Sequence, residues 1–202
     1  MAAAVDEASI DHPDPVENVL QTARLKAQTI YERFLKEGRL PQGESERVII
    51  IAADTTVTLD GQMLGKPANT ADATRMLRAL RGRWHEVHTG MALVVLETGE
   101  EATAVHTAYV TMRPYSAQEI DDYVASGDPM DKAGAYAIQN ALFRPVESLE
   151  GCYLGVMGLT VCQLQQLLDR LNVPAVADPE ELAAAHGHYT CPLFQNWMLD
   201  HN

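Results

Sequence analysis

The sequence predicts an α/β protein with a mixed, twisted β-sheet flanked by helices. Amphipathic stretches in which apolar residues recur three and four positions apart are typical of helices that cover a sheet. Residues 48–53 form a continuous apolar run, which is typical of a strand covered on both faces. Two-residue turn signals elsewhere indicate hairpins as well, and this combination favours a mixed sheet.

The first predicted helix spans residues 15–36. Asp14 is its expected cap, Pro15 takes the first helical position, and Gly38 ends the apolar repeat. Because each residue turns the helix by 100°, Lys26 lies about 75° from the centre of the apolar stripe. It is therefore expected to flank the buried face, where it could lean into a cleft.

The first predicted strand is the apolar run that ends in Asp54, with an extended continuation to about Thr58. Asp60-Gly61 is a strong hairpin signal directly after it. The remaining predicted elements follow in order: a helix from Thr70 to Gly82, strands Trp84–Leu96 and Ala102–Met112, a helix from Ser116 to Gly127, an irregular segment from Asp128 to Gly158, a helix from Thr160 to just before Pro174, and a short acidic helix over Ala175–Ala185.

Length and composition are those of an ordinary folded protein. The 202 residues fit one domain with a modest appendage, and 47% apolar residues suffice for a core. We expect the main domain to cover residues 1–172, with 173–202 as a C-terminal extension of unknown role. The sequence shows neither a membrane-spanning run nor a signal peptide, so a soluble cytoplasmic protein is expected.

The formal net charge of −13 argues against a partner that is a long nucleic acid, because such binding depends on neutralising phosphates. A small polyphosphate remains compatible with this charge. Only a few basic side chains and a divalent ion need to gather at one point to bind it.

Asp54 is the first candidate for chemistry. A carboxylate at the end of a buried strand lies where α/β proteins bind ligands. Its oxygens suit Mg²⁺ or Mn²⁺, and it could also take a proton from an attacking water molecule. The alternative is a structural aspartate that caps a turn.

Two further stretches carry candidate ligand-binding residues. Lys66 lies between Gly65 and Pro67, which restrict the backbone and hold a charge suited to phosphate, although most surface lysines are only solvated. In residues 131–139, small side chains permit close approach of a ligand to the backbone. Gln139 at the end of this segment offers both a donor and an acceptor to the edge of a base.

The histidines and cysteines give weaker signals. Three cysteines without paired spacing argue against a disulfide framework, and two of them have apolar surroundings typical of buried small hydrophobes. The strand histidines are expected to be core or surface residues: His85, His88 and His106. The tail holds zinc-type ligands in a spacing that fits no strong pattern: His186, His188, Cys191 and His201.

Several sequence blocks, taken together, resemble the Maf family of nucleotide pyrophosphatases. The likeness runs from about Val5 to Leu171, and its strongest blocks are Ala52–Val57, Leu64–Pro67, Leu80–Gly90, Tyr123 with Gly127–Pro129, and Asp131–Gln139. The resemblance implies a Maf/ITPase-like fold with a nucleotide cleft. It also implies hydrolysis between the α and β phosphates of a nucleoside triphosphate, a divalent metal (Mg²⁺ or Mn²⁺), and dimerisation.

The resemblance also implies roles for individual residues. Asp54 matches the catalytic acidic residue, and Glu7 matches an acidic residue that helps to hold the metal with it. Three lysines are candidates for substrate binding: Lys26, Lys66 and Lys132. Thr55 and Gln139 match positions that shape base choice in the dTTP- and UTP-cleaving branch, so a pyrimidine triphosphate is the expected substrate.

The family's opening strand and its Ser-Pro-Arg loop have no counterpart before the Val5–Glu7 block. That loop contacts the phosphates in the family, so the sequence leaves two hypotheses open. One is an active pyrophosphatase for dTTP, UTP or close relatives. The other is a catalytically impaired relative that binds nucleotides or a partner in cell-division control.

Overall fold

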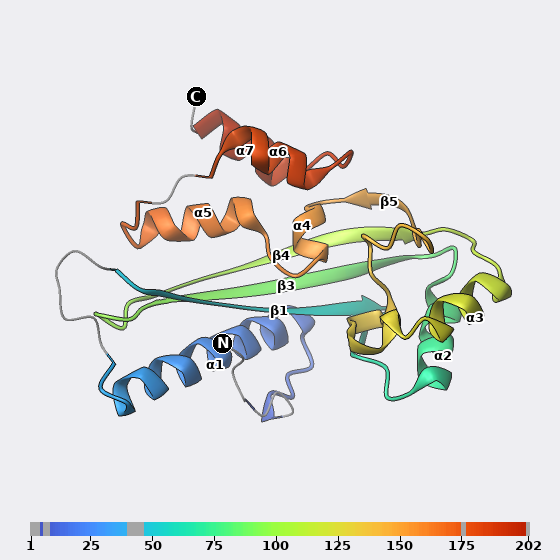
Figure 1. The fold of residues 1–202 in the computed structure, drawn as a ribbon, viewed down its shortest axis with the longest axis horizontal. Coiled ribbons are helices and arrows are strands. Elements are labelled where there is room, and N and C mark those ends of the chain that lie inside the picture. The colour runs from blue at the N-terminus through green and yellow to red at the C-terminus, as the bar shows by residue number, and fades with distance from the viewer. Residues whose placement is uncertain (1–4, 6–8, 40–46, 175–176, 201–202) are drawn as a thin grey trace.

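The structure, a computed structural model, describes residues 5, 9–39, 47–174 and 177–200. A five-stranded sheet forms its middle layer (Figure 1). Helix α1 (Pro15–Lys36) covers one face, and α4 (Tyr153–Val156) and α5 (Val161–Arg170) cover the other. The expected fold class, an α/β protein with a sheet flanked by helices, is confirmed.

The other elements complete these layers. The strands are β1 (Ile49–Leu59), β2 (Gln62–Leu64), β3 (Trp84–Val95), β4 (Glu101–Met112) and β5 (Val146–Glu150). The remaining helices are α2 (Thr70–Leu80), α3 (Ala117–Ala125), the 3₁₀ turns η2 (Asp128–Asp131) and η3 (Ala133–Ala135), α6 (Pro179–His186) and α7 (Pro192–Asp200). Within the described ranges, no helix combines the length and apolarity needed to cross a bilayer.

The strand pairing corrects the expectation of a mixed sheet. The strands lie in the order β2-β1-β3-β4-β5, and all four pairings between the described strands are antiparallel. The hairpins β1–β2 and β3–β4 account for two of them. Strand β3 begins, after α2, beside the C-terminal end of β1, where β2 also pairs. It therefore runs antiparallel to β1.

Strand β1 is longer than its apolar part. Its ladder with β3 is continuous from the Ile49–Val95 pair to the Thr58–Glu86 pair. The threonines that follow the apolar run continue the strand because β-branched side chains favour extended backbone. Asp54 therefore lies in the middle of β1, opposite Gly90, and its expected position at a strand end is wrong.

Helix α1 packs unusually close to the sheet at Gly90. A β-carbon added there would lie 2.6 Å from the carbonyl oxygen of Val19 and 2.9 Å from the nitrogen of Leu20. Backbone therefore meets backbone at this point. The small side chains of Ala23 and Ala27 are buried against the same face of the sheet, which keeps the whole helix near it.

The opposite face is covered by the C-terminal half of the chain. Leu167 of α5 and Leu171, which follows the helix, belong to one buried cluster with Met91 and Leu93 of β3. Helices α6 and α7 form an outer layer beyond α4 and α5 (Figure 1). Helix α6 begins at Pro179, later than the predicted Ala175, because the Asp178 side chain caps it.

Substitution of Gly90 by alanine should lower the stability of the fold. The new methyl group would collide with the backbone of α1, and overpacking of this kind costs about 1–3 kcal/mol. We expect the free energy of unfolding, measured by urea denaturation, to fall by that amount. Gly65→Ala is the matched control, since its β-carbon would meet nothing within 4 Å. Equal stability of the two variants would contradict the account of helix packing.

Candidate active site

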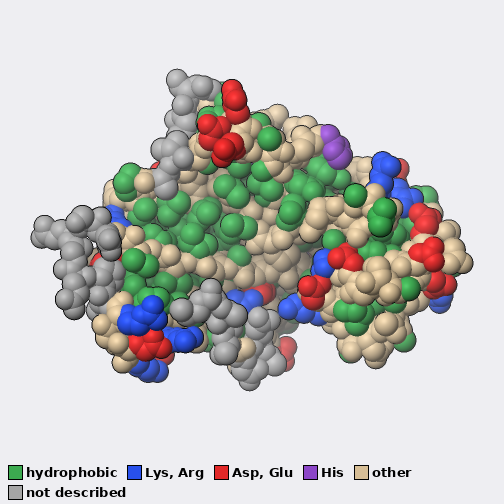
Figure 2. Space-filling view, viewed as in Figure 1, with side chains coloured by type: hydrophobic (Ala, Val, Ile, Leu, Met, Phe, Trp, Pro, Cys, Tyr) green, Lys and Arg blue, Asp and Glu red, His purple; other side chains and the backbone are tan. Residues whose placement is uncertain are grey.

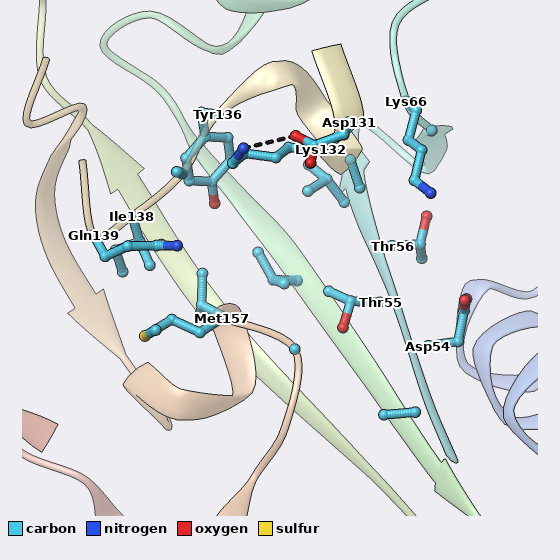
Figure 3. Close-up of a pocket in the computed structure, with 18 of the residues that line it drawn as sticks. Asp54, Thr55, Thr56, Lys66, Asp131, Lys132, Tyr136, Ile138, Gln139 and Met157 are labelled. Atoms are coloured by element: carbon cyan, nitrogen blue, oxygen red, sulfur yellow. Dashed lines mark hydrogen bonds and ion pairs between the residues drawn. The ribbon is translucent and has the colours of Figure 1, made fainter. Parts of the chain in front are cut away.

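A cavity of about 480 Å³ opens beside the middle of β1 (Figure 3). Its walls come from α1, β1, the turn after β2, the η2–η3 segment, and the residues at the end of α4. In the space-filling view, basic and acidic side chains gather in the middle of this face (Figure 2). Among the described residues, six sequence-predicted candidates line the cavity: Lys26, Asp54, Thr55, Lys66, Lys132 and Gln139.

The ion pair between Lys26 and Asp54 forms one wall. Lys26 Nζ donates to Asp54 Oδ1 across 2.6 Å, and the two side chains are 19% and 18% exposed. Side chains alternate along a strand, so Asp54 faces α1 together with Ile50 and Ala52. The close packing of α1 at Gly90 brings Lys26 within reach of the carboxylate.

Lys66 supplies a second positive charge. It lies in the turn after β2, where the carbonyl of Gly65 accepts a hydrogen bond from the nitrogen of Gly134 across 3.1 Å. Its exposed side chain points towards Thr56 and the side of the cavity that holds Asp54 (Figure 3). The turn is thus anchored to η3, while the ammonium group stays open to the cavity.

Lys132 is bound to neighbouring carboxylates. Its Nζ lies 2.7 Å from Asp131 Oδ1, 3.1 Å from Asp128 Oδ1 and 2.7 Å from the carbonyl oxygen of Asp128. Burial lowers the pKa of Lys132, but the hydrogen bonds to these aspartates outweigh burial and raise it. Lys132 therefore stays charged, and it shares that charge with two aspartates as well as with the cavity.

Thr55 faces the other side of β1. Its hydroxyl lies 3.0 Å from that of Thr89 on β3, and Thr89 donates to the carbonyl oxygen of Gly155 in α4 across 2.8 Å. This chain of hydrogen bonds ties β1 to the segment that forms the far wall. Because side chains alternate along β1, the charged Lys26–Asp54 pair and the uncharged hydroxyl of Thr55 lie on opposite sides of the strand.

That far wall is mostly uncharged. Gln139 is exposed at the cavity, and Figure 3 places it near Ile138 and Met157. Tyr136 also lines the cavity, and its hydroxyl lies 2.8 Å from Nε2 of His85; both residues are buried. Burial raises the pKa of the Tyr136 phenol and lowers that of His85 to about 4, so both side chains are neutral near pH 7.

The residues present fit a hard divalent cation. Asp54 presents carboxylate oxygens inside the cavity, and Mg²⁺ is commonly held by one or two carboxylates together with substrate phosphates. Glu7, the second predicted ligand, lies outside the described residues. The metal-binding roles of Asp54 and Glu7 stay predictions.

The cavity also contains residues that the sequence analysis did not single out. Asn18 lies eight residues before Lys26 on α1, a spacing that places both on one side of a helix and could have indicated it. Thr56 lines the cavity beside two predicted residues of β1. Met157 comes from the segment predicted to be irregular, and no sequence signal marked it.

The cavity is therefore divided by charge. Asp54, with its partner Lys26, and Lys66 lie at one end, and the other end has uncharged and apolar walls with the exposed amide of Gln139. Lys132, paired with Asp131, extends beside Tyr136 (Figure 3). Such a cleft suits a compact polyanion that carries an uncharged ring system, which is the composition of a nucleotide.

Comparison with known proteins agrees with this description. The family model described as Maf-like protein matches residues 1–171. The chain belongs to this family.

Several curated relatives resemble most of the chain. The dTTP/UTP pyrophosphatase of Dictyoglomus thermophilum is 43% identical over 169 residues, which are 83% of this chain and 81% of that protein. The protein of the same name from Thermomicrobium roseum is 40% identical over 190 residues, 94% of this chain and 83% of the relative. The dTTP/UTP pyrophosphatase of Alkalilimnicola ehrlichii is 42% identical over 173 residues, which are 86% of this chain and 82% of that protein.

The buried His85–Tyr136 pair predicts a loss of stability in mild acid. The pKa of His85 is about 4 in the folded protein, against 6.5 for an ordinary histidine. Between these pH values the unfolded chain binds a proton that the folded chain does not, so folding weakens as the pH falls. The contribution of His85 to the free energy of unfolding is therefore fully present above pH 6.5. It falls by about 3 kcal/mol by pH 4.

Urea denaturation at pH 7 and pH 5 measures this effect. Carboxylates titrate mostly below pH 5, so they contribute little to the change in stability between these two pH values. The variant His85→Gln keeps a hydrogen-bonding group for Tyr136 but does not titrate. We expect its stability to depend less on pH than that of the parent protein. His88 and His106, whose pKa values burial also lowers, account for the remaining slope. An unchanged slope in His85→Gln would contradict the prediction.

Proposed function

We propose that this protein is a nucleoside triphosphate pyrophosphatase that cleaves between the α and β phosphates of dTTP- or UTP-like nucleotides. The products would be the nucleoside monophosphate and pyrophosphate. The observation that carries the proposal is the Lys26–Asp54 pair at 2.6 Å, in the same cleft as Lys66. Names of relatives that are about 40% identical support the substrate class. A cytoplasmic location and a homodimer belong to the same proposal.

Charge is central to the proposed mechanism. A triphosphate adds several negative charges to the cleft, and the Lys66 side chain points into the cleft where it could meet them. Lys26 holds Asp54 in one orientation, and the Asp54 carboxylate is the proposed acceptor of a proton from an attacking water molecule. Fixed charges of this kind act mainly by stabilising the charge that develops on the phosphates.

A divalent cation, Mg²⁺ or Mn²⁺, would add to this by offsetting phosphate charge and making a bound water more acidic. Asp54, and Glu7 by resemblance, are the proposed protein ligands. Because carboxylate oxygens are hard donors, the proposal favours these ions over thiophilic metals in the cleft.

Base selection is proposed for the uncharged end of the cleft. Gln139 can donate to and accept from the edge of a pyrimidine, and Thr55 borders the space between that residue and the charged end. The hydrogen bonds of Thr55 and Thr89 hold this side of β1 against α4. The proposal therefore assigns dTTP or UTP as the substrate. With a formal net charge of −13, it does not include long nucleic acids as partners.

Asp54→Asn is the decisive test of the mechanism. Asparagine keeps the shape of the side chain but cannot take the proton, so turnover should fall by a factor of about 10²–10⁴. Release of pyrophosphate from dTTP and UTP with Mg²⁺ or Mn²⁺ is the measurement, and calorimetry should still detect nucleotide binding. Asp131→Asn is the matched control, because this carboxylate lines the same cavity but pairs with Lys132.

Unchanged turnover in Asp54→Asn would remove Asp54 from the mechanism. If the parent protein binds triphosphates without turnover under every divalent metal, the alternative of a nucleotide- or partner-binding protein is favoured instead.

Gln139→Leu tests the assignment of the base end. Leucine has a similar size but forms no hydrogen bond, and one lost bond of about 1 kcal/mol lowers kcat/KM about fivefold. We expect this loss for dTTP and UTP, with a smaller change for 7-methyl-GTP. The control Gln118→Leu changes an exposed glutamine on α3, outside the residues that line the cavity. Equal losses for all nucleotides would contradict a role in base choice.

A further inference from the structure

Three buried cysteines and one buried histidine meet between α4, α5, α6 and the start of α7. Cys152 and Cys162 are fully buried, and Cys191 and His186 are each 2% exposed. They come from three separate parts of the chain. We call these four residues the Cys₃His cluster. It lies behind the wall of the nucleotide cleft and shares no residue with it.

The side chains of this cluster point at one another. Nε2 of His186 lies 3.8 Å from the sulfur of Cys152 and 3.9 Å from that of Cys162. The sulfur of Cys191 lies within hydrogen-bonding reach of both other thiols. The ligand atoms of Cys152, His186 and Cys191 all lie within 4.8 Å of one another.

The histidine is held in the orientation that a metal ligand needs. Its Nδ1 lies 2.7 Å from the carbonyl oxygen of Leu182, an acceptor that requires the proton on Nδ1. Nε2 therefore carries the lone pair, and it faces the sulfurs. The ring also stacks on Phe194 of α7, with centroids 5.2 Å apart. Metal-bound histidines commonly have this second hydrogen bond, which fixes the tautomer.

The sulfurs are placed as acceptors. The backbone amides of Leu154 and Gly155 lie near the sulfur of Cys152, and that of Phe194 lies near the sulfur of Cys191, where each amide favours negative charge on sulfur. A buried thiol that only fills space does not need such donors. Thiolates bound to a metal do benefit from them, because the amides offset negative charge on sulfur.

Hydrogen bonds alone account poorly for this geometry. Nε2 has one lone pair, yet two sulfurs lie at nearly the same distance from it. In a tetrahedral zinc site with Zn–S of about 2.3 Å and Zn–N of about 2.0 Å, sulfur and nitrogen lie about 3.5 Å apart. The observed sulfur–nitrogen distances of 3.8 and 3.9 Å need a contraction of only a few tenths of an ångström. The sulfur of Cys162 lies outside the group whose ligand atoms are all within 4.8 Å of one another, so it must move further than the others to complete a four-ligand site.

We infer that Cys152, Cys162, Cys191 and His186 bind one Zn²⁺ ion as a closed, structural Cys₃His site. Three sulfurs and one imidazole are soft ligands that select zinc over the hard cations suited to the nucleotide cleft. The ion fastens α6 and α7 to α4 and α5. Of the tail residues with zinc-type side chains, His186 and Cys191 belong to the cluster, whereas the exposed His188 does not. His201 lies outside the described residues.

Metal analysis of the purified protein tests this inference. Elemental mass spectrometry should find one zinc per chain, and His186→Gln should lose it. His188→Gln, a change of the same kind two residues away and on the surface, should retain the ion. X-ray absorption at the zinc edge should show three sulfurs at about 2.3 Å and one nitrogen at about 2.0 Å. Asp54→Asn should also retain the ion, which separates this site from the cleft.

Cobalt substitution of the parent protein gives a second measurement if His186→Gln does not fold. A tetrahedral Co²⁺ thiolate site would show strong visible bands and a sulfur-to-cobalt charge-transfer band. Three results would each overturn the inference. One is a protein without zinc or cobalt binding under anaerobic, reducing conditions. The second is zinc that follows Asp54 and not His186, and the third is a disulfide among the three cysteines in protein isolated without reductant.

Discussion

The closeness of α1 to the sheet at Gly90 is the constraint on which the cleft depends. No side chain separates the helix backbone from β3 at this point, and Gly90 pairs directly with Asp54 on β1. Lys26 lies two turns further along the helix, and helical side chains lean towards the N-terminus. Its ammonium group therefore comes back over the strand to the carboxylate. The 2.6 Å ion pair is a consequence of this packing as much as of charge.

Alternation along β1 then divides the cleft into two environments. Asp54 faces the helix, while its neighbour Thr55 faces α4 through the hydroxyl of Thr89. One extended segment thus presents a charged group to one side and a hydrogen-bonded, neutral group to the other. The strict period of two in a strand makes this separation possible without any insertion or bulge between the two residues.

Local patterns in the sequence predicted the helices and strands that contain a full amphipathic repeat or an alternating run. The Asp14 cap of α1 and the capping box at Ser116 are both present in the structure. The end of the apolar run predicts a strand end at Asp54 followed by an extended segment, and hydrophobicity alone does not show that this segment stays paired with β3. Strand β5 and helix α7 were missed, since β5 is short and exposed and α7 follows Pro192 without a clear apolar period.

The site shows the same limit of local patterns. Six candidate residues line one cavity. Five of them could be identified because they sit in distinctive sequence blocks, and Lys26 was identified from its place on the helix and by resemblance, although the roles of all six are still predictions. The Cys₃His cluster had no such block. Its ligands are separated by 10, 24 and 5 positions along the chain, and only the packing of α6 and α7 on α4 and α5 brings them together. Contacts of this kind depend on tertiary structure and cannot be derived from spacing.

The division of the cleft also affects how the protein could change over evolutionary time. The charged end depends on α1, β1 and the turn after β2, whereas the neutral end is formed mostly by η3, Gln139 and the residues after α4. Substitutions at Gln139 or Met157 leave the backbone contact at Gly90 unaffected. Substrate preference could therefore drift through the neutral end while the charged end stays constant, which offers a route by which one scaffold acquires different nucleotide specificities.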